Sequence, residues 1–402
     1  MTRKRNLILF ASAVFLLWFS QYVFYPTLPE YLREKVDSLT VVGAVLAMYG
    51  LWQVVVRLPL GILIDAVGRQ KLFLLGGFLL CAIGALLLGT GKTAGAMYLG
   101  RSLSGLAMSI WVPLVVVFSG FFPAAQSVRA SAILSLVTAV ARISATALNG
   151  YLNEMGGYVL AFLIAVAAAG LGVVLVLPVP VDSRAAGRPQ LRPLLRLFLH
   201  RSVILPSLLA AINQYVIFGI SLGFMPVLAK QLGAGDVALG YLATTNLLFF
   251  LLGNLIATSS SSRFTPALTL LASYSLFATA IATAAVSKGV FLLFVVQGCI
   301  GFAHGIGYPV LMGMTIRDIP SGQRTAAMGL HQSVYAAGIF VGPWASGALA
   351  DAIGIRPMFG LTAALVLVFG LSGGILLSRR ATLKDFRKEQ SPGKPPEKGT
   401  TP

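Results

Sequence analysis

The stretch at residues 61–69, Gly-Ile-Leu-Ile-Asp-Ala-Val-Gly-Arg, ends a long apolar run and decides the fold. Its pattern, Gly-x-Leu-x-acid-x-x-Gly, recurs at residues 150–157 and at residues 347–354, each time where an apolar run ends. A fourth run ends at residues 253–257 with a shortened copy that lacks the acid. A single copy would be interpreted as an ordinary helix end, whereas several copies at related positions indicate an internal repeat.

The composition around this stretch excludes a soluble globular protein. Hydrophobic residues make up 57% of the chain and charged residues 10%, against about 25% charged residues in soluble proteins. The apolar runs are close to the ~20 residues that a helix needs to cross a membrane, and much longer than the ~10-residue strands of a membrane barrel. We therefore expect an all-α integral membrane protein with twelve spans. The predicted spans are residues 6–28, 39–62, 72–90, 95–120, 130–153, 157–180, 204–230, 237–257, 267–286, 290–313, 326–350 and 357–378.

The repeat arranges these spans in two halves. Spans two and five end in the same pattern but cross in opposite directions, and so do spans eight and eleven, while the two halves match in the same direction. Such inverted repeats, nested within parallel halves, characterise one large class of transporters. We expect two pseudosymmetric six-helix bundles at residues 1–180 and 204–378, a basic cytoplasmic linker at 181–203 and a disordered cytoplasmic tail at 379–402.

The basic residues orient the chain in the membrane. The net charge is +18, but Lys and Arg stand at the ends of apolar runs and form no basic domain, which excludes nucleic-acid binding. With both termini in the cytoplasm, most of the 30 Lys and Arg residues fall on the cytoplasmic side, as the positive-inside rule expects. The first span is too long for a signal peptide. We expect a multi-pass protein of a bacterial inner membrane, in which the linker arginines either lie on the anionic leaflet or simply enforce this topology.

Three motifs resemble those of the major facilitator superfamily. Residues 61–71 resemble its signature between spans two and three, and residues 101–105, Arg-Ser-Leu-Ser-Gly, look like its span-four arginine motif. Residues 338–347 are similar to its Gly-x-x-x-Gly-Pro pattern in span eleven. The resemblance covers the whole chain and implies a rocker-switch fold and substrate transport, often coupled to protons. Span five departs from the drug antiporters of the family, because residues 145–150 lack their Gly-Pro motif.

The resemblance also implies gating roles. The position of Asp65 helps to latch the cytoplasmic side closed in the family, and Arg69 belongs to the same charge relay. Glycine lets helix backbones approach closely, and a carboxylate just past a helix end can reach the N-terminal dipole of a neighbouring helix. Such a contact can exist in one conformation and break in another. The expected latch residues are Gly61, Asp65, Gly68, Arg69, Arg101, Gly342 and Pro343.

Charged groups inside the membrane are the default functional candidates because their desolvation is expensive. All 12 Asp and Glu residues fall in loops or at span ends, so no central carboxylate is available for a proton relay. Arg142, by contrast, stands near the middle of span five. It belongs to a polar stripe at helical spacing that we expect to face the protein interior or a wet cavity. The stripe comprises Ser131, Ser135, Thr138, Arg142, Thr146, Asn149 and Asn153.

An arginine inside a span is either a binding group or a structural one. Arg142 either anchors a substrate anion or polarised oxygen with its planar fork of donors, or is a structural arginine satisfied by carbonyls and amides of a neighbouring span. For Arg101 we expect a structural ion pair with Glu30 or Glu34, whose positions along the chain place them within reach. Arg57 stands near the cytoplasmic end of span two, where its side chain can extend to the interface.

Polar residues of other spans complete the expected cavity. His304 is the only histidine that the sequence places deep in a span. It either couples transport to protons or is a hydrogen-bonded core residue. Asp65 and Glu30 are the alternative candidates for proton coupling. Aromatic residues, including Trp18 and Trp111, predict an apolar lining that suits an amphipathic organic molecule. The remaining cavity candidates are Gln21, Tyr25, Asn213, Gln214, Gln297 and Tyr308.

The sequence therefore favours a secondary transporter that moves a small organic solute by alternating access. Efflux of amphipathic compounds, coupled to an ion gradient, is the leading hypothesis, and transport of a small organic anion anchored by Arg142 is the alternative. A non-transporting sensor or scaffold on the same fold is a further alternative. No phosphate-binding loop, catalytic motif or metal-ligand cluster is present, so we expect no enzyme, cofactor or metal. The expected partners are a small-molecule substrate and the lipid bilayer, with the chain acting as a monomer.

Overall fold

The computed structural model describes residues 2–123, 126–181, 200–259, 264–320 and 323–389. Within these ranges the chain is helical and contains no strand, as expected for an all-α membrane protein. The first half contains α1 (Thr2–Tyr22), η1 (Tyr25–Thr27), α2 (Leu28–Arg33), α3 (Leu39–Val67), α4 (Gln70–Thr90), α5 (Ala94–Met108), α6 (Trp111–Gly120) and α7 (Ser127–Val176). The second half contains α9 (Arg201–Tyr215), η3 (Val216–Phe224), α10 (Met225–Gln231), α11 (Asp236–Ser259), α12 (Pro266–Val286), α13 (Val290–Arg317), α14 (Arg324–Ile353) and α15 (Ile355–Glu389).

Helix α7 accounts for two of the twelve predicted spans. Eleven helical stretches among the described residues are long and apolar enough to cross a membrane, and one of them is the stretch Arg129–Val176. Its backbone leaves the helical conformation at Gly156 and Gly157, where Gly157 has a φ of 69°, a value that glycine adopts without steric cost. The second part of α7 runs back toward the end of the bundle at which α4 begins. There Lys71 of α4 donates a hydrogen bond to the carbonyl of Leu177 at 2.5 Å.

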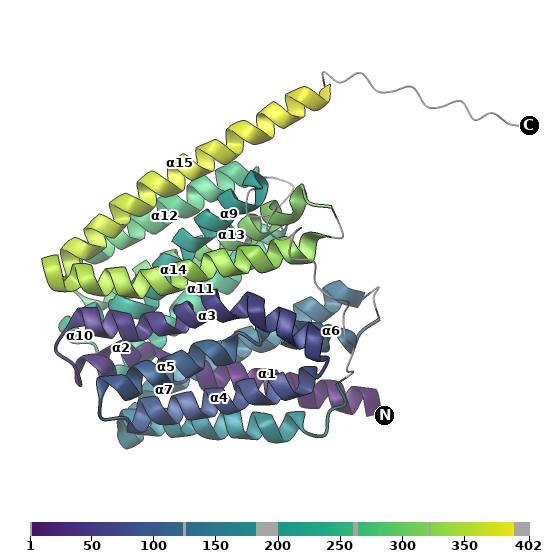
Figure 1. Ribbon diagram of the computed structural model, residues 1–402. Helices are drawn as coiled ribbons and strands as arrows, with labels where there is room; N and C mark the ends of the chain where they lie inside the picture. The colour runs from purple at the N-terminus through teal and green to yellow at the C-terminus, as the bar shows by residue number, and fades with distance from the viewer. Residues whose placement is uncertain (1, 124–125, 182–199, 260–263, 321–322, 390–402) are drawn as a thin grey trace, which may run out of the picture.

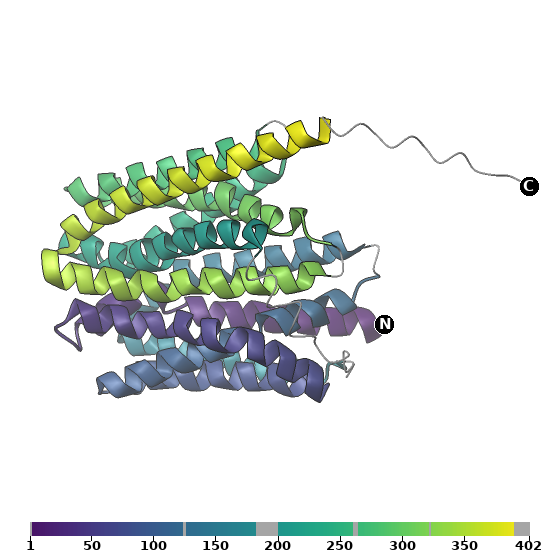
Figure 2. The same ribbon diagram turned by 45° about the horizontal axis from the view of Figure 1, so that its top comes forward.

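The helices form two bundles that lie one above the other, with the first half of the chain below and the second half above (Figures 1 and 2). Helix α1 begins and helix α15 ends at the same end of the molecule, which we call the terminal end. The opposite end, with the α1–α3 and α10–α11 connections, is the distal end. The bundles meet mainly along the pairs α3–α14 and α7–α11.

The first helix of each bundle is interrupted at a corresponding place. Helix α1 ends at Tyr22 and continues through η1 into α2, while α9 ends at Tyr215 and continues through η3, a π-helix, into α10. A proline follows each interruption, Pro29 at the start of α2 and Pro226 at the start of α10, and proline cannot donate a backbone hydrogen bond to the preceding turn. Paired interruptions of this kind mark the substrate region of transporters with internal repeats.

At the distal end, α3 and α14 are held together by a helix cap. The Asp351 carboxylate accepts hydrogen bonds from the backbone N–H groups of Leu39 and Thr40 at 2.9 and 2.8 Å. The hydroxyls of Ser38 and Thr40 each donate to the same carboxylate at 2.7 Å. An acid from one bundle therefore caps the N-terminus of a helix in the other, where the helix dipole favours a negative charge.

The second pair, α7 and α11, is also closed at the distal end. Asn153 donates to the carboxylate of Asp236 at 3.0 Å, and the hydroxyls of Thr146 and Thr244 lie 2.8 Å apart. A side chain on Gly150 would collide with the backbone of α11, so a glycine is required at this crossing. Both helix pairs thus seal the distal end of the interface.

Toward the terminal end the bundles separate. A side chain on Gly43 or Gly50 of α3 would strike the backbone of α14, whereas one on Gly61 would meet no atom within 4 Å. Gly329 of α14 likewise has no neighbour within 4 Å of an added side chain. The two helices diverge toward the termini in both views (Figures 1 and 2). The interface is therefore closed at the distal end and parted at the terminal end.

Two predicted segments lie largely outside the described residues. Residues 182–199 of the expected linker belong to this part of the chain, and so do residues 390–402 of the expected tail. The beginning of that tail differs from the prediction, because α15 continues as a helix to Glu389. The apolar span predicts where α15 begins, but helix propagation is cooperative and continues into the polar residues that follow.

Candidate functional site

Two arginines of the first bundle lie among aromatic rings near the interface of the bundles. We call Arg142 with Trp18, Tyr22 and Phe250 the Arg142 box, and Arg101 with Tyr25, Tyr49 and Phe218 the Arg101 box. In each box the arginine and two rings belong to the first bundle, and the phenylalanine belongs to the second.

The Arg142 box is polar at its centre and aromatic at its walls. The guanidinium carbon lies 5.3 Å from the ring centre of Trp18, 5.7 Å from that of Tyr22 and 5.9 Å from that of Phe250. Its Nε donates to the carbonyl of Thr138 at 3.3 Å. Among the described residues no other hydrogen bond and no ion pair reaches this side chain. The half-buried guanidinium therefore keeps both terminal nitrogens available for a ligand.

The polar stripe of α7 divides at Arg142. On its distal side, Asn149 donates to the carbonyl of Val23 at 2.8 Å and to the hydroxyl of Thr27 at 3.1 Å. Asn149 therefore holds the interrupted segment after α1 in place. The stripe residues beyond Arg142 tie helices together, and Arg142 itself faces the aromatic box.

The Arg101 box is closed. Arg101 is fully buried, with 0% of its surface exposed, and its guanidinium carbon lies 4.6 Å from the ring centre of Tyr25 and 4.3 Å from that of Tyr49. All three of its side-chain nitrogens lack a hydrogen-bond partner. The Phe218 ring covers both tyrosines, with ring centres 6.2 Å from Tyr25 and 5.9 Å from Tyr49.

The expected ion pair of Arg101 is wrong. Glu30 instead pairs with Arg33, Oε1 to Nη2 at 2.6 Å, and the Glu34 carboxylate accepts from the Tyr158 hydroxyl at 3.2 Å. Arg33 follows Glu30 by one helical turn, so a local partner takes the carboxylate first. Burying an unpaired charge costs several kcal/mol, and a desolvated cation–π contact returns up to about 2 kcal/mol. The two tyrosines therefore offset a part of this cost.

His304 faces the Arg142 box from the second bundle. Its ring centre lies 4.5 Å from that of Phe250 and 5.5 Å from that of Tyr308, and its Nε2 is buried without a partner. Tyr308 is followed by Tyr335, with ring centres 5.9 Å apart. The Tyr335 hydroxyl accepts a hydrogen bond from Arg57 of the first bundle at 3.1 Å. Arg57 thus joins the two bundles instead of extending to the interface.

Two of the predicted cavity residues are structural ties. Gln297 donates to the carbonyl of Ser221 at 3.0 Å and accepts from the Ser221 hydroxyl at 2.6 Å. Asn246 also donates to the side-chain oxygen of Gln297. Gln21 donates to the Sγ of Cys81 at 2.7 Å inside the first bundle. The structure places both outside the boxes. The Gln297 amide is satisfied by its neighbours, whereas the amide oxygen of Gln21 is buried without a partner.

Two other predicted residues stay unsatisfied. Asn213 is fully buried, and neither its amide nitrogen nor its oxygen has a partner; the amide oxygen of Gln214 also lacks one. They directly precede the interruption of α9, as Gln21 precedes that of α1. Sequence reasoning missed the signal for these paired interruptions, which is the shared triplet Gln-Tyr-Val at residues 21–23 and 214–216.

A second buried histidine was also missed. His331, in the first third of α14, is fully buried. The hydroxyls of Ser207 and Thr315 donate to the carbonyls of Val203 and Leu311, at 2.6 and 2.9 Å. Both hydroxyls lie 3.0 Å from His331 Nδ1, and its Nε2 is buried without a partner.

The expected latch residues lie at both ends. Gly68 caps α3 with a φ of 69°, and Arg69 beside it is exposed; the Asp65 side chain lies outside the described part. Pro343 and Gly342 lie instead in α14 toward the distal end, where the Pro343 carbonyl packs on Gly43. Close backbone contacts thus involve the glycine-proline motif and not the terminal-end signature.

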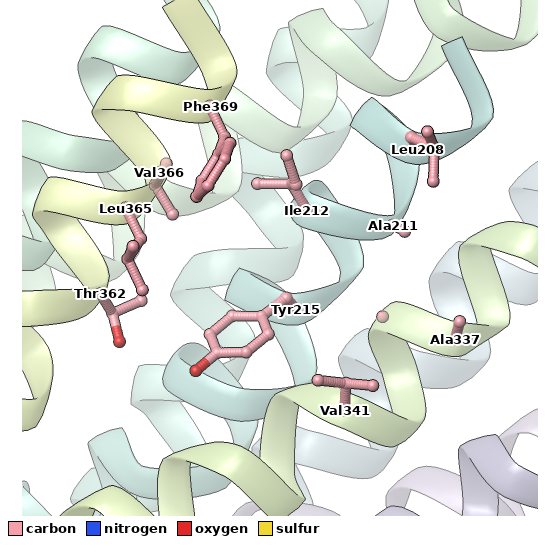
Figure 3. Close-up of a pocket in the computed structure, with 11 residues that line it drawn as sticks. Leu208, Ala211, Ile212, Tyr215, Ala337, Val341, Thr362, Leu365, Val366 and Phe369 are labelled. Carbon is pink, nitrogen blue, oxygen red and sulfur yellow. The ribbon is translucent and has the colours of Figure 1, made fainter. Parts of the chain in front are cut away.

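An apolar groove lies on α9, α14 and α15. It has a volume of about 360 Å³, and Tyr215 and Thr362 carry the hydroxyls that Figure 3 shows at its wall. Leu208 and Phe369 on its rim are about half exposed, at 50% and 56%. The groove offers no charged group, so it lacks the polar fixtures that would recognise a particular ligand.

Comparisons with known proteins agree with this architecture. A family model described as Major Facilitator Superfamily matches residues 10–226 and 208–400. No curated protein matches the sequence. A mutant of the nucleoside transporter NupG superposes with a TM-score of 0.78 at 17% identity, covering 92% of this chain and 98% of that one.

Two further solved structures are similar. A bacterial homologue of the human lysosomal transporter Spinster, in an inward-facing and unoccupied conformation, gives a TM-score of 0.78 at 15% identity over 94% of this chain and 97% of its own. A POT family transporter in complex with 5-aminolevulinic acid gives a TM-score of 0.75 at 13% identity, covering 93% of this chain and 96% of its own. At such identities the likeness shows the fold and leaves the solute to be argued from the site.

Proposed function

The chain belongs to the major facilitator superfamily, and from this premise we propose that it moves a small organic anion with an aromatic or apolar body by alternating access. Family and fold make it a membrane transporter of a solute rather than an enzyme. The nature of that solute is argued from the Arg142 box.

The Arg142 box supports this proposal because it presents a positive charge without a counterion between aromatic side chains. A guanidinium binds a carboxylate or sulfonate through two parallel hydrogen bonds, and both terminal nitrogens of Arg142 are available for this. Trp18 and Phe250 at 5.3 and 5.9 Å would hold the apolar body of the solute. A neutral solute would leave the charge uncompensated inside the membrane, which is unfavourable.

We place the terminal end in the cytoplasm of a bacterial cell, with the chain in the inner membrane, because the basic residues favour this orientation. The parted end at Gly61 and Gly329 then opens inward, and the Asp351 cap closes the outer side. The likeness to the inward-facing Spinster homologue supports this assignment. In the alternate state, Asp65 and its signature would close the cytoplasmic side.

His304 is the group through which we propose coupling to protons. Glu30 is already paired with Arg33, whereas His304 has a free Nε2 and lies against Phe250 of the Arg142 box. A proton on His304 adds a second positive charge near the bound anion, so proton and anion should bind together. Acidifying the side from which the solute is taken up should stimulate its uptake, and His304→Gln should remove this stimulation.

The test of the proposed function compares a charged solute with an uncharged one of the same shape. Proteoliposomes are assayed with 4-toluenesulfonate and 4-toluenesulfonamide. Arg142→Gln should lower kcat/KM for the sulfonate by about 100-fold, because a charge-assisted pair contributes about 1.5–3 kcal/mol. Arg142→Lys should keep a part of the activity. Arg129→Gln on the same helix, where the side chain is exposed, is the matched control and should leave transport unchanged.

Efflux of amphipathic compounds is the second candidate, and the aromatic walls of the box favour it. It predicts that Arg142→Gln leaves the transport of both probes at the wild-type level, which would contradict the anion proposal. A sensor or scaffold on the same fold predicts no flux of either probe, or of a broader panel of solutes, through the wild-type protein.

A further inference from the structure

We propose that the Arg101 box is a second binding subsite for the anionic group of the solute, accessible when the distal end opens. The Arg142 box would serve the state that is open at the terminal end, and the Arg101 box the opposite state. This inference rests on the proposed transport of an organic anion and adds a second arginine to its path.

The first observation is a buried charge without a counterion. The Arg101 side chain is fully buried, its three nitrogens have no hydrogen-bond partner, and neither ion pair in the described part of the chain involves it. Arginine stays charged even when buried. Because proteins rarely leave such a group unanswered, we infer that an anion answers it in another state of the transport cycle.

The second observation is the position of the two boxes along one path. The rings of Tyr22 and Tyr25 stack with centres 5.7 Å apart, and Tyr22 contacts Arg142 while Tyr25 contacts Arg101. Asn149, which holds the Tyr25 segment, lies two turns or about 10 Å along α7 from Arg142 toward the distal end. The Arg101 box is therefore the distal neighbour of the Arg142 box.

The third observation is the element that covers the Arg101 box. Phe218 of η3 belongs to the second bundle, whereas Tyr25 and Tyr49 belong to the first. Opening the distal end separates the bundles and so removes Phe218 from the two tyrosines. The guanidinium would then face the opened side and lose the ring that now covers its two tyrosines. A small anion could pass from one arginine to the other along the stacked tyrosines.

The experiment measures which arginine an anion protects in each state. We use phenylglyoxal, which modifies accessible arginines, with 4-toluenesulfonate as the protecting anion and peptide mass spectrometry as the readout. In the wild-type protein, Arg142 should react and be protected, and Arg101 should not react. A distal-open variant, Gly43→Leu with Gly150→Leu, places side chains where both glycines now contact the second bundle. In this variant Arg101 should react, and 4-toluenesulfonate should slow its modification by about tenfold.

Two controls keep the result decisive. Thr244→Cys, at a buried contact of the distal end, should react with an impermeant maleimide in the distal-open variant and not in the wild-type background. Where this cysteine reports opening but the anion does not protect Arg101, the second subsite is refuted. Protection of Arg142 in the same samples shows separately that the proposed function holds.

A transport assay tests the sidedness directly. Arg101→Gln should raise the KM for 4-toluenesulfonate at least about tenfold from the distal side and leave the terminal-side KM unchanged. Arg101→Lys, which keeps the charge, should retain most of the distal affinity, and exposed Lys35→Gln at the same end should have no effect. An equal change of KM from both sides, or no change from either, would overturn the proposal.

Discussion

The two arginine boxes contain the same kinds of group in different environments. Arg101 is fully buried against two tyrosines and has no hydrogen bond, whereas Arg142 is half-buried and bonds to the Thr138 carbonyl at 3.3 Å. The helix contacts around them explain the difference, because the bundles are sealed at the distal end and parted at the terminal end. We therefore assign each arginine its proposed state of the transport cycle from how the bundles meet and not from the arginine itself.

The largest effect on stability should come from removing an aromatic wall of the closed box. Tyr49→Leu removes a ring 4.3 Å from a fully buried guanidinium and should lower the free energy of unfolding by about 2 kcal/mol. Trp18→Leu removes a ring 5.3 Å from half-buried Arg142 and should cost less than about 1 kcal/mol. Denaturation of both variants in detergent checks this, and equal losses would contradict the difference between the boxes.

The sequence predicts the helices and the inward position of Arg142 well, because each rests on a local pattern. A long apolar run specifies a span, and the spacing of the polar stripe specifies a helix face. Gln297 and Gln21 were placed in the cavity because helical spacing does not identify the partner across the bundle. Ser221 and Cys81, to which their amide nitrogens donate, are distant in the sequence.

For Arg101, too, the sequence did not identify the groups that surround the side chain. Its position predicts a glutamate partner, but Glu30 forms its ion pair with Arg33, one helical turn along the chain. The tyrosines that surround Arg101 come from η1 and α3, and their approach depends on the interruption after α1. A triplet shared by the first span of each half was the available signal, and it becomes informative once both interruptions are seen to follow it.

A smaller effect is expected from weakening the helix cap at the distal end, which should make the Arg101 box more accessible. Asp351→Asn keeps the shape of the cap but removes the charge that faces the N-terminus of α3, which should favour distal opening by about 1–1.5 kcal/mol. Arg101 should then react faster with phenylglyoxal. Asp236→Asn is the matched control, because Asp236 receives a single hydrogen bond from the first bundle, from Asn153 at 3.0 Å. A larger effect of Asp236→Asn would show that α7–α11 and not α3–α14 keeps the box closed.

The smallest effect concerns the contact nearest the parted end. Tyr335→Phe removes the hydroxyl that accepts a hydrogen bond from Arg57 at 3.1 Å, while Arg57 keeps its second bond to Gln53 at 2.5 Å. The loss should be about 0.5–1 kcal/mol and should part the bundles further at the terminal end, so that Arg142 reacts faster with phenylglyoxal and Arg101 stays unreactive. Gln53→Leu, which removes the bond within the first bundle, should change the reactivity of Arg142 less. Faster modification of Arg101 in Tyr335→Phe would mean that the two ends open together, and alternating access requires that they open in turn.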